Sequence, residues 1–221
     1  MSTLYIFLFL IANLVANSSS SKLLDEITES GIEILEKARD GTQIRQCSCV
    51  EQGTCVKETE NDILKCSKSC FGSVEKLTAQ TEQLRACFEA RIYLAQNFLK
   101  CFIENIEGCV NNKNGPMIPR VDINELIRLG KERLHAQVEH FTKTLTKPFD
   151  RMLTVAAEIG ECAKECVLKK NKDGFCFDRI GCQPKFDIKR ARKTLRKCSK
   201  KIDWKREAGG LCECAVRAGI R

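Results

Sequence analysis

Apolar residues recur every three or four positions along most of this chain, which is the spacing of a single buried stripe on a helix. Residues 22–39 carry one such stripe, and the turn-forming pair Asp40-Gly41 follows it and is expected to end that helix. Residues 61–107 continue the pattern for longer than a globular helix usually runs. We therefore expect a turn near residues 78–82, which would fold this stretch into a helical hairpin.

The clearest break in the pattern is at residues 111–120, where NNKNGPMIPR combines turn-forming residues with one glycine and two prolines. A helix is expected to begin just after it, because Asp122 is a suitable N-cap and Glu125 occupies the capping-box position. Pro148 then kinks this helix or starts another. No segment reads as a strand, so the sequence predicts an all-α fold. That fold is a disulfide-stapled helical structure, either one bundle or two cysteine-rich helical units.

The first residues have the pattern of a secretory signal peptide. Residues 4–15 are apolar apart from Asn13, a run shorter than the roughly 20 residues that span a membrane. Small residues follow, which favours cleavage near Ser18; the alternative is a buried N-terminal helix. No later apolar run is long enough to cross a bilayer. We therefore predict a signal peptide at 1–18 and a secreted, extracellular protein.

Charge is unevenly divided along the rest of the chain. Residues 19–110 carry 11 basic and 15 acidic side chains, a net charge of −4, whereas residues 111–221 carry 26 and 14, a net charge of +12. We predict an acidic N-terminal cysteine-rich helical unit at 19–110, a linker at 111–120 and a basic C-terminal unit at 121–221. The basic half is the candidate for anionic partners.

Fifteen cysteines follow the predicted signal peptide, a density that is typical of proteins from an oxidising compartment. A metal or redox site is the alternative, but such sites favour C-x-x-C spacing, which the chain lacks. We therefore predict disulfides, with no metal site and no cofactor. Because the count is odd, one cysteine is unpaired or bonds to another chain. The cysteines are Cys47, Cys49, Cys55, Cys66, Cys70, Cys87, Cys101, Cys109, Cys162, Cys166, Cys176, Cys182, Cys198, Cys212 and Cys214.

The spacing of two cysteine pairs restricts how they can bond. Cys66 and Cys70 are one helical turn apart, as are Cys162 and Cys166, so the Cβ atoms of each pair are separated by about 5–6 Å. A disulfide needs about 3.5–4.5 Å. The members of each pair are therefore expected to bond to different segments. Cys70 with Cys87, across the expected hairpin turn, is the pairing that we predict.

The motifs CSCVEQG, CSKSC, CAKEC and CECAVRAG give residues 47–109 and 162–214 a shared pattern of cysteine spacing. In a helical, secreted chain this pattern resembles the cysteine-rich domain of nematode chondroitin proteoglycans. The resemblance implies a non-enzymatic extracellular protein that serves as a core protein for sulfated sugar chains. Such a role needs Ser-Gly attachment sites beside acidic residues, and Ser30-Gly31 is the candidate. The alternative for Ser30 is an ordinary solvent-facing position on a helix.

The chain shows no recognisable set of catalytic residues. Its two histidines, His135 and His140, are five positions apart and point in different directions on a helix. Motifs of nucleophilic catalysis and phosphate binding, such as G-x-S-x-G, do not occur. We therefore predict that the protein is not an enzyme.

Residues 187–206 hold ten basic and two acidic side chains on a helical pattern. If the apolar stripe from Ile188 to Ile202 faces the core, the basic residues share the opposite face, where neighbours of one sign repel each other. An anionic partner would relieve that repulsion. The predicted polyanion-binding residues are Lys189, Arg190, Arg192, Lys193, Arg196, Lys197, Lys200 and Lys201.

Sulfated glycosaminoglycan is the partner that we predict first, because it is an abundant extracellular polyanion. A membrane surface, nucleic acid and an acidic surface of the same or another molecule are alternatives. Secretion and the lack of interleaved aromatic residues argue against nucleic acid. The competing function is that of a secreted effector or receptor-type module that binds another protein, with the basic face only a solvated surface.

Overall fold

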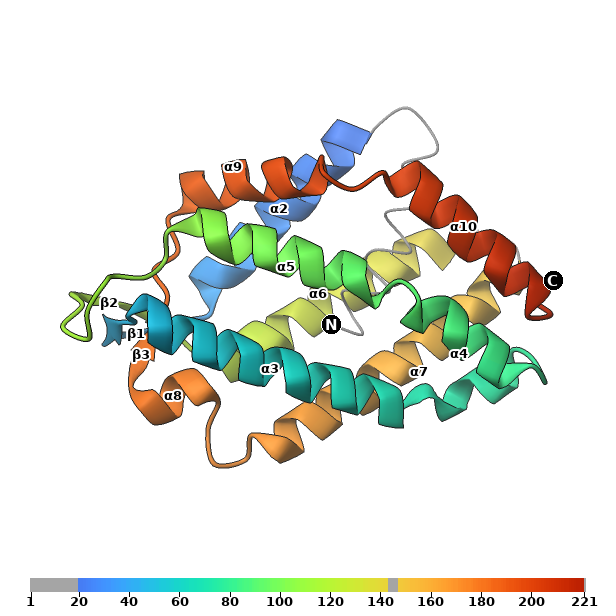
Figure 1. Ribbon diagram of the computed structural model, residues 1–221, viewed down its shortest axis with the longest axis horizontal. Helices are drawn as coiled ribbons and strands as arrows, with labels where there is room; N and C mark the ends of the chain where they lie inside the picture. The colour runs from blue at the N-terminus through green and yellow to red at the C-terminus, as the bar shows by residue number, and fades with distance from the viewer. Residues whose placement is uncertain (1–19, 143–146, 221) are drawn as a thin grey trace.

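The computed structural model describes residues 20–142 and 147–220, and most of them lie in helices (Figure 1). The predicted signal peptide, residues 1–18, lies outside the described residues. Within the described ranges no helix combines the length and the apolar character needed to cross a membrane. The elements in chain order are α2 (Ser20–Lys37), β1 (Arg39–Gln46), α3 (Cys49–Ser69), the 3₁₀ helix η1 (Phe71–Lys76), α4 (Thr81–Glu89), α5 (Ile92–Ile106), β2 (Met117–Val121), α6 (Ile123–Thr142), α7 (Lys147–Lys170), α8 (Cys176–Ile180), β3 (Cys182–Gln183), α9 (Ile188–Ser199) and α10 (Trp204–Arg217).

Several helix boundaries follow signals that are visible in the sequence. The turn expected near residues 78–82 is present, because the chain turns after η1 and α4 begins at Thr81. The Oδ1 atom of Asp122 accepts hydrogen bonds from the backbone N–H groups of Asn124 (2.8 Å) and Glu125 (3.2 Å), which confirms the predicted N-cap of α6. Pro148 is the second residue of α7 and so starts a helix, at a position where its missing N–H removes no helical hydrogen bond.

A small three-stranded sheet in the described part of the chain corrects the prediction of an all-α fold. β1 is central, antiparallel to β2 and parallel to β3. The sequence of β1, RDGTQIRQ, is mostly polar and does not alternate, so it carries no strand signal. The sequence predicts that Asp40-Gly41 ends the first helix, but α2 already ends at Lys37. Gly41 instead has a φ of 79° at the place where the β1–β2 register shifts.

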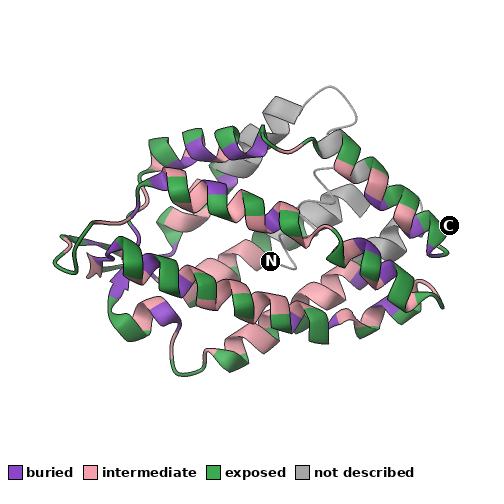
Figure 2. Ribbon diagram, viewed as in Figure 1, coloured by how far each residue is buried: buried purple, intermediate pink, exposed green. Residues whose placement is uncertain are grey.

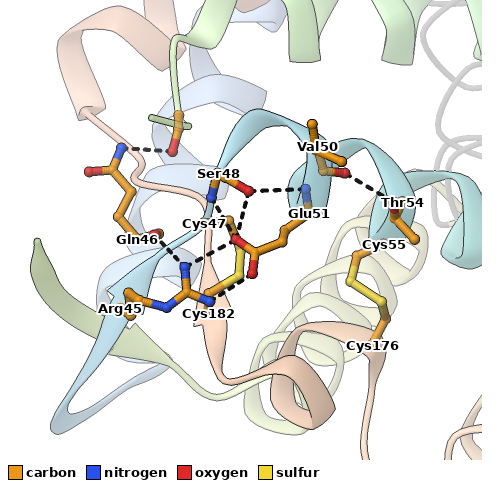
Figure 3. The surroundings of a disulfide bond; sticks show 11 residues. Arg45, Gln46, Cys47, Ser48, Val50, Glu51, Thr54, Cys55, Cys176 and Cys182 are labelled. Carbon is orange, nitrogen blue, oxygen red and sulfur yellow. Dashed lines mark hydrogen bonds and ion pairs between the residues drawn. A yellow bond between two sulfur atoms is a disulfide. The ribbon is translucent and has the colours of Figure 1, made fainter. Parts of the chain in front are cut away.

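Two buried glutamines complete the hydrogen bonding around this sheet. The backbone N–H of Val121 donates to Oε1 of Gln183 (3.0 Å), and Nε2 of Gln183 donates to the Val121 carbonyl (2.8 Å). Nε2 of Gln46 donates to the carbonyl of Gly108 at 2.9 Å (Figure 3). Because both glutamines are at most 5% exposed, their amides satisfy backbone groups that water reaches poorly.

Four disulfides among the described residues connect the segment from β1 to the end of α3 with the segment from α7 to β3. They are nested, so the first cysteine of one segment bonds to the last cysteine of the other. The two segments therefore run antiparallel, and α3 packs along α7 (Figure 1). We call these bonds the disulfide ladder; its rungs are Cys47–Cys182, Cys55–Cys176, Cys66–Cys166 and Cys70–Cys162.

The two inner rungs of the ladder join the two one-turn cysteine pairs to each other. Cys66 bonds to Cys166 and Cys70 bonds to Cys162, with Cα atoms 5.6 and 5.7 Å apart. The expectation that the members of one pair bond to different segments is therefore wrong, because antiparallel helices with equal four-residue spacing bring both cysteines of a pair opposite one partner helix. The predicted Cys70–Cys87 bond is wrong as well, because α3 packs on α7 whereas α4 packs on α10.

All fifteen cysteines fall within the described ranges, and Cys212 is the free, exposed cysteine that the odd count requires. Of the seven disulfides in those ranges, six join a residue before the predicted linker at 111–120 to a residue after it. The division into two units at this linker stays a prediction, but the two halves are cross-linked along their length. Outside the ladder, the disulfides are Cys49–Cys109, Cys87–Cys214 and Cys101–Cys198.

A cluster of buried hydrophobic residues lies where η1, α4, α7 and α10 meet. Val74, Leu84, Val155, Ala215 and Ala218 are all at most 4% exposed there. Elsewhere along the described helices, buried positions are interspersed with half-buried and exposed ones (Figure 2). This cluster therefore packs η1 and α4 against α7 and α10.

The first turn of α3 is held by a network of charged hydrogen bonds (Figure 3). Ser48 is the N-cap: its hydroxyl accepts from the Glu51 N–H (3.3 Å), and the Ser48 N–H donates to Glu51 Oε2 (2.9 Å), which makes a capping box. The Arg45 guanidinium donates to both carboxylate oxygens of Glu51, at 3.0 and 2.9 Å. This network fixes the chain between β1 and α3, next to two rungs of the ladder.

The same network predicts an acid-sensitive contribution to stability. Hydrogen bonds from Arg45 and then from Ser48 lower the pKa of Glu51 from 4.5 to about 2. A carboxylate with a lowered folded-state pKa stabilises the fold fully above pH 4.5, and this stabilisation is lost as the pH falls toward 2. We expect urea unfolding to give a lower free energy of unfolding for Glu51→Gln than for the wild type. This difference should be constant above pH 5 and should shrink between pH 4.5 and pH 2. A deficit independent of pH would show that the Glu51 charge contributes nothing.

Candidate functional site

Helix α9 presents its buried face to the protein and its basic face to solvent. Its N-cap is Asp187, whose Oδ1 accepts from the backbone N–H of Arg190 at 2.8 Å. The helix packs against α5 and α2, and the disulfide Cys101–Cys198 holds it to α5. Figure 2 shows exposed positions along the outer side of α9. The basic surface therefore lies on a helix that a disulfide anchors to the rest of the protein.

The predicted inward stripe of this helix is buried to different degrees. Ala191 and Cys198 are 7% and 1% exposed, but Ile188, Leu195 and Ile202 are half-buried. The stripe faces inward, yet its larger side chains are not fully covered by neighbouring atoms.

Six of the eight predicted basic residues surround one open hollow of about 360 Å³ on the outer side of α9. The hollow spans three turns of the helix, and each turn contributes basic groups. Seven of the eight predicted side chains are exposed, and Arg192 is half-buried. We call this feature the basic hollow; it is lined by Lys189, Arg192, Lys193, Arg196, Lys197 and Lys200.

The other two predicted residues lie away from the basic hollow. Arg190 forms an ion pair with Glu107 at the C-terminal end of α5. Lys201 lines a separate hollow of about 380 Å³ together with Tyr93 and Glu207. The structure therefore brings six of the eight predicted side chains together and separates two.

Polar groups of neighbouring helices offset part of the positive charge in the basic hollow. Arg192 forms an ion pair with Glu29 of α2, at 2.6 Å, and Lys197 Nζ donates to Asn105 Oδ1 at 2.5 Å. Among the described residues, Lys189, Lys193 and Lys200 have no acidic partner. Exposed ion pairs contribute only about 0–1 kcal/mol, so a multivalent anion can compete for these side chains.

The remaining candidates from the sequence do not form a catalytic or metal site in the described ranges. His135 is exposed, and His140 falls where side chains are not described. No cluster of potential metal ligands occurs among the residues that the structure describes. Ser30 is 6% exposed and its Oγ accepts a hydrogen bond from Arg133 Nε at 2.8 Å, which disfavours attachment of a sugar chain to the folded protein.

A large apolar cavity is the feature that sequence reasoning misses. It has a volume of about 540 Å³ and is lined by side chains from α2, α3, α5, α6, α7 and α9 and from the segment that includes α8 and β3. Ala191 and Leu195 of α9 line it from the side of that helix away from the basic hollow. An apolar stripe looks the same in sequence whether it packs on other side chains or lines a cavity.

Comparison of the chain with protein family models, with curated proteins and with solved structures found no match.

Proposed function

We propose that the protein is a secreted, non-enzymatic protein that binds sulfated glycosaminoglycan through the basic hollow on α9. The observation that carries the proposal is the convergence of six basic side chains from successive turns of one helix on a single open surface. Arginine can bind a sulfate group with two parallel hydrogen bonds, and lysine adds mobile point charges. Seven disulfides in the described ranges are typical of a protein from an oxidising compartment.

The anchoring of α9 supports this function. The helix is bonded to α5 through Cys101–Cys198, so its basic side chains extend from a backbone that is fixed before binding. Such preorganisation lowers the entropy that a flexible basic segment would lose on binding. The resemblance to chondroitin proteoglycans stays a prediction, and the buried hydroxyl of Ser30 argues against its use as a sugar attachment site.

Heparin chromatography tests the proposal. We expect the protein to bind a heparin column and to elute at a salt concentration well above physiological, because binding releases counterions from the polyanion. A variant in which Lys189, Lys193, Lys197 and Lys200 become Gln should elute at much lower salt, and its affinity at physiological salt should fall by about tenfold or more. The slope of log Kd against log salt concentration should decrease in the same variant.

A matched control separates the basic hollow from net charge alone. Lys57, Lys65, Lys113 and Lys172 are exposed and lie outside the basic hollow, so changing all four to Gln removes the same charge from other surfaces. This control should elute close to the wild type. Equal losses in both variants would show that only overall charge matters, and no loss in either would refute the proposal. A saturable, salt-insensitive complex with an extracellular protein would favour the competing effector or receptor-type function.

A further inference from the structure

The apolar cavity is partly open to solvent, and disulfides hold several of the described helices that line it. Cys55–Cys176 and Cys66–Cys166 connect α3 with α8 and α7, and Cys101–Cys198 connects α5 with α9. All of these elements contribute to the lining. A bundle held together only by side-chain packing would gain stability by collapsing into such a space. Here the cross-links restrict how closely α3 can approach α7 and α8, and how closely α5 can approach α9, which favours an open space between these helices.

Several side chains on the cavity walls are less buried than those of the hydrophobic cluster between η1, α4, α7 and α10. Ile63, Phe102 and Leu195 line the cavity and are half-buried, although they lie on the inward stripes of their helices. In contrast, Val74 and Val155 in the cluster between η1, α4, α7 and α10 are at most 2% exposed. The interior is therefore open at one particular place, where aliphatic and phenyl groups lack close neighbours.

The lining restricts the chemistry of a ligand to one polar end. Almost all of the lining groups are aliphatic or aromatic, and the volume falls in the range of roughly 300–1,000 Å³ typical of small-molecule sites. Gln183 is one of the few polar residues, but both ends of its amide already bond to the Val121 backbone. Among the described residues that line the cavity, Lys164 is the one that carries a charge. Its ammonium pairs with Glu161, and Lys131 Nζ shares that carboxylate at 3.0 Å, so two ammonium groups lie close together.

We propose that this cavity binds the hydrocarbon chain of a long-chain fatty acid, with the carboxylate of the ligand beside Lys164. A ligand with an extended apolar body needs few further polar partners, which matches a lining whose described polar side chains are only Thr59, Lys164 and Gln183. The carboxylate takes part in the ion pairing between Lys131, Lys164 and Glu161. This site is independent of the basic hollow, because α9 contributes Leu195 to one and Lys193 to the other.

Fluorescence titration of the full, oxidised protein with cis-parinaric acid tests the proposal, with palmitic acid and hexadecanol as competitors. We expect saturable binding at one site with a Kd on the order of 1 µM, and displacement by palmitic acid. The variant Leu195→Trp fills part of the cavity and should weaken binding by about tenfold or more. The absence of saturable binding by the wild-type protein, or unchanged binding by a folded Leu195→Trp, would overturn the proposal.

Two further variants test the position of the carboxylate and of the site. Lys164→Met removes the charge and keeps most of the length of the side chain. It should weaken the binding of palmitic acid about tenfold and leave the binding of hexadecanol unchanged. Lys169→Met, an exposed position on the same helix outside the lining, is the matched control and should bind both as the wild type does. Equal losses for both ligands in Lys164→Met would overturn the assignment of the carboxylate. The four-lysine variant of the basic hollow should retain palmitic acid binding, and a loss there would place the ligand on the outer face of α9 and refute the cavity site.

Discussion

A variant that lacks both Cys66–Cys166 and Cys70–Cys162 is expected to lose more stability than the two single deletions lose together. The two bonds connect α3 and α7 one helical turn apart, and each encloses about a hundred residues of chain. When one is removed, the other still holds the same two helices together in the unfolded chain. The single deletion therefore releases only a small ring, whereas the double deletion frees α3 and α7 as far as the next rung, Cys55–Cys176.

The chain-entropy description of disulfides gives the expected sizes. Each single deletion, made as a pair of Cys→Ala changes, should cost about 2.5 kcal/mol, and the double deletion about 6 kcal/mol, which exceeds the sum of the two single losses. For a chain of this length the double deletion lowers Tm by about 15 °C. Equilibrium urea unfolding of the four proteins, with the other disulfides intact, yields the double-mutant cycle.

The control for the change from cysteine itself is Cys212→Ala. This cysteine is free and exposed, so its removal should change the unfolding free energy by no more than about 0.5 kcal/mol. Additive losses in the two single deletions would contradict the ladder, because they would mean that the rungs restrict the unfolded chain independently.

The sequence is a good guide to the helices but a poor one to the sheet. The capping residues around Asp122 and the apolar stripes predict elements that the structure contains, because a helix is encoded by neighbours a few residues apart. The sequence of strand β1 contains no such local pattern. β1 is a strand because it pairs with β2 and β3, both far away in sequence, and the disulfide Cys47–Cys182 joins the chain just after β1 to β3.

The disulfides show the same distinction between local and long-range information. Composition predicts that the cysteines are cross-linked and that one is left over, but the spacing of Cys66 and Cys70 shows only that they do not bond to each other. Their partners depend on which helix lies beside α3. The nested order emerges only once α7 is placed antiparallel to it. The resemblance of CSKSC to CAKEC is notable in this light, because the two motifs are joined to each other.

The two faces of α9 illustrate what a stripe pattern can reveal about a site. Periodicity places Lys193 and Leu195 on opposite sides of the helix, and the structure agrees. It does not reveal that Arg190 is paired with Glu107, or that the space beyond Leu195 is open. Both depend on α5 and the other helices around α9, which the sequence of α9 does not encode.

Replacing Gln183 by Glu is expected to destabilise the protein strongly at neutral pH and much less in acid. One carboxylate oxygen can still accept from the Val121 N–H, but the other faces the Val121 carbonyl at the position where Nε2 donates at 2.8 Å. The site is 4% exposed, so water cannot solvate the charge. The loss of one hydrogen bond together with the burial of a charge should cost about 3 kcal/mol or more at pH 7.

The dependence of stability on pH separates two effects of Gln183→Glu: the burial of a charge and the loss of the hydrogen bond that the amide donates. Burial and the facing carbonyl raise the pKa of the new carboxyl group in the folded state. The loss of unfolding free energy relative to the wild type therefore grows as the pH rises above about 4.3 and shrinks below it. In acid the protonated carboxyl can donate to the Val121 carbonyl as the amide does. Gln183→Met should instead show a deficit of about 1–3 kcal/mol that does not change with pH, and Gln43→Glu, at an exposed position of β1, should stay within about 0.5 kcal/mol of the wild type. Urea unfolding of all four proteins at pH 7 and pH 3.5 distinguishes these outcomes. If Gln183→Glu lost the same unfolding free energy at both pH values, the glutamine amide would not join β2 to β3 as described.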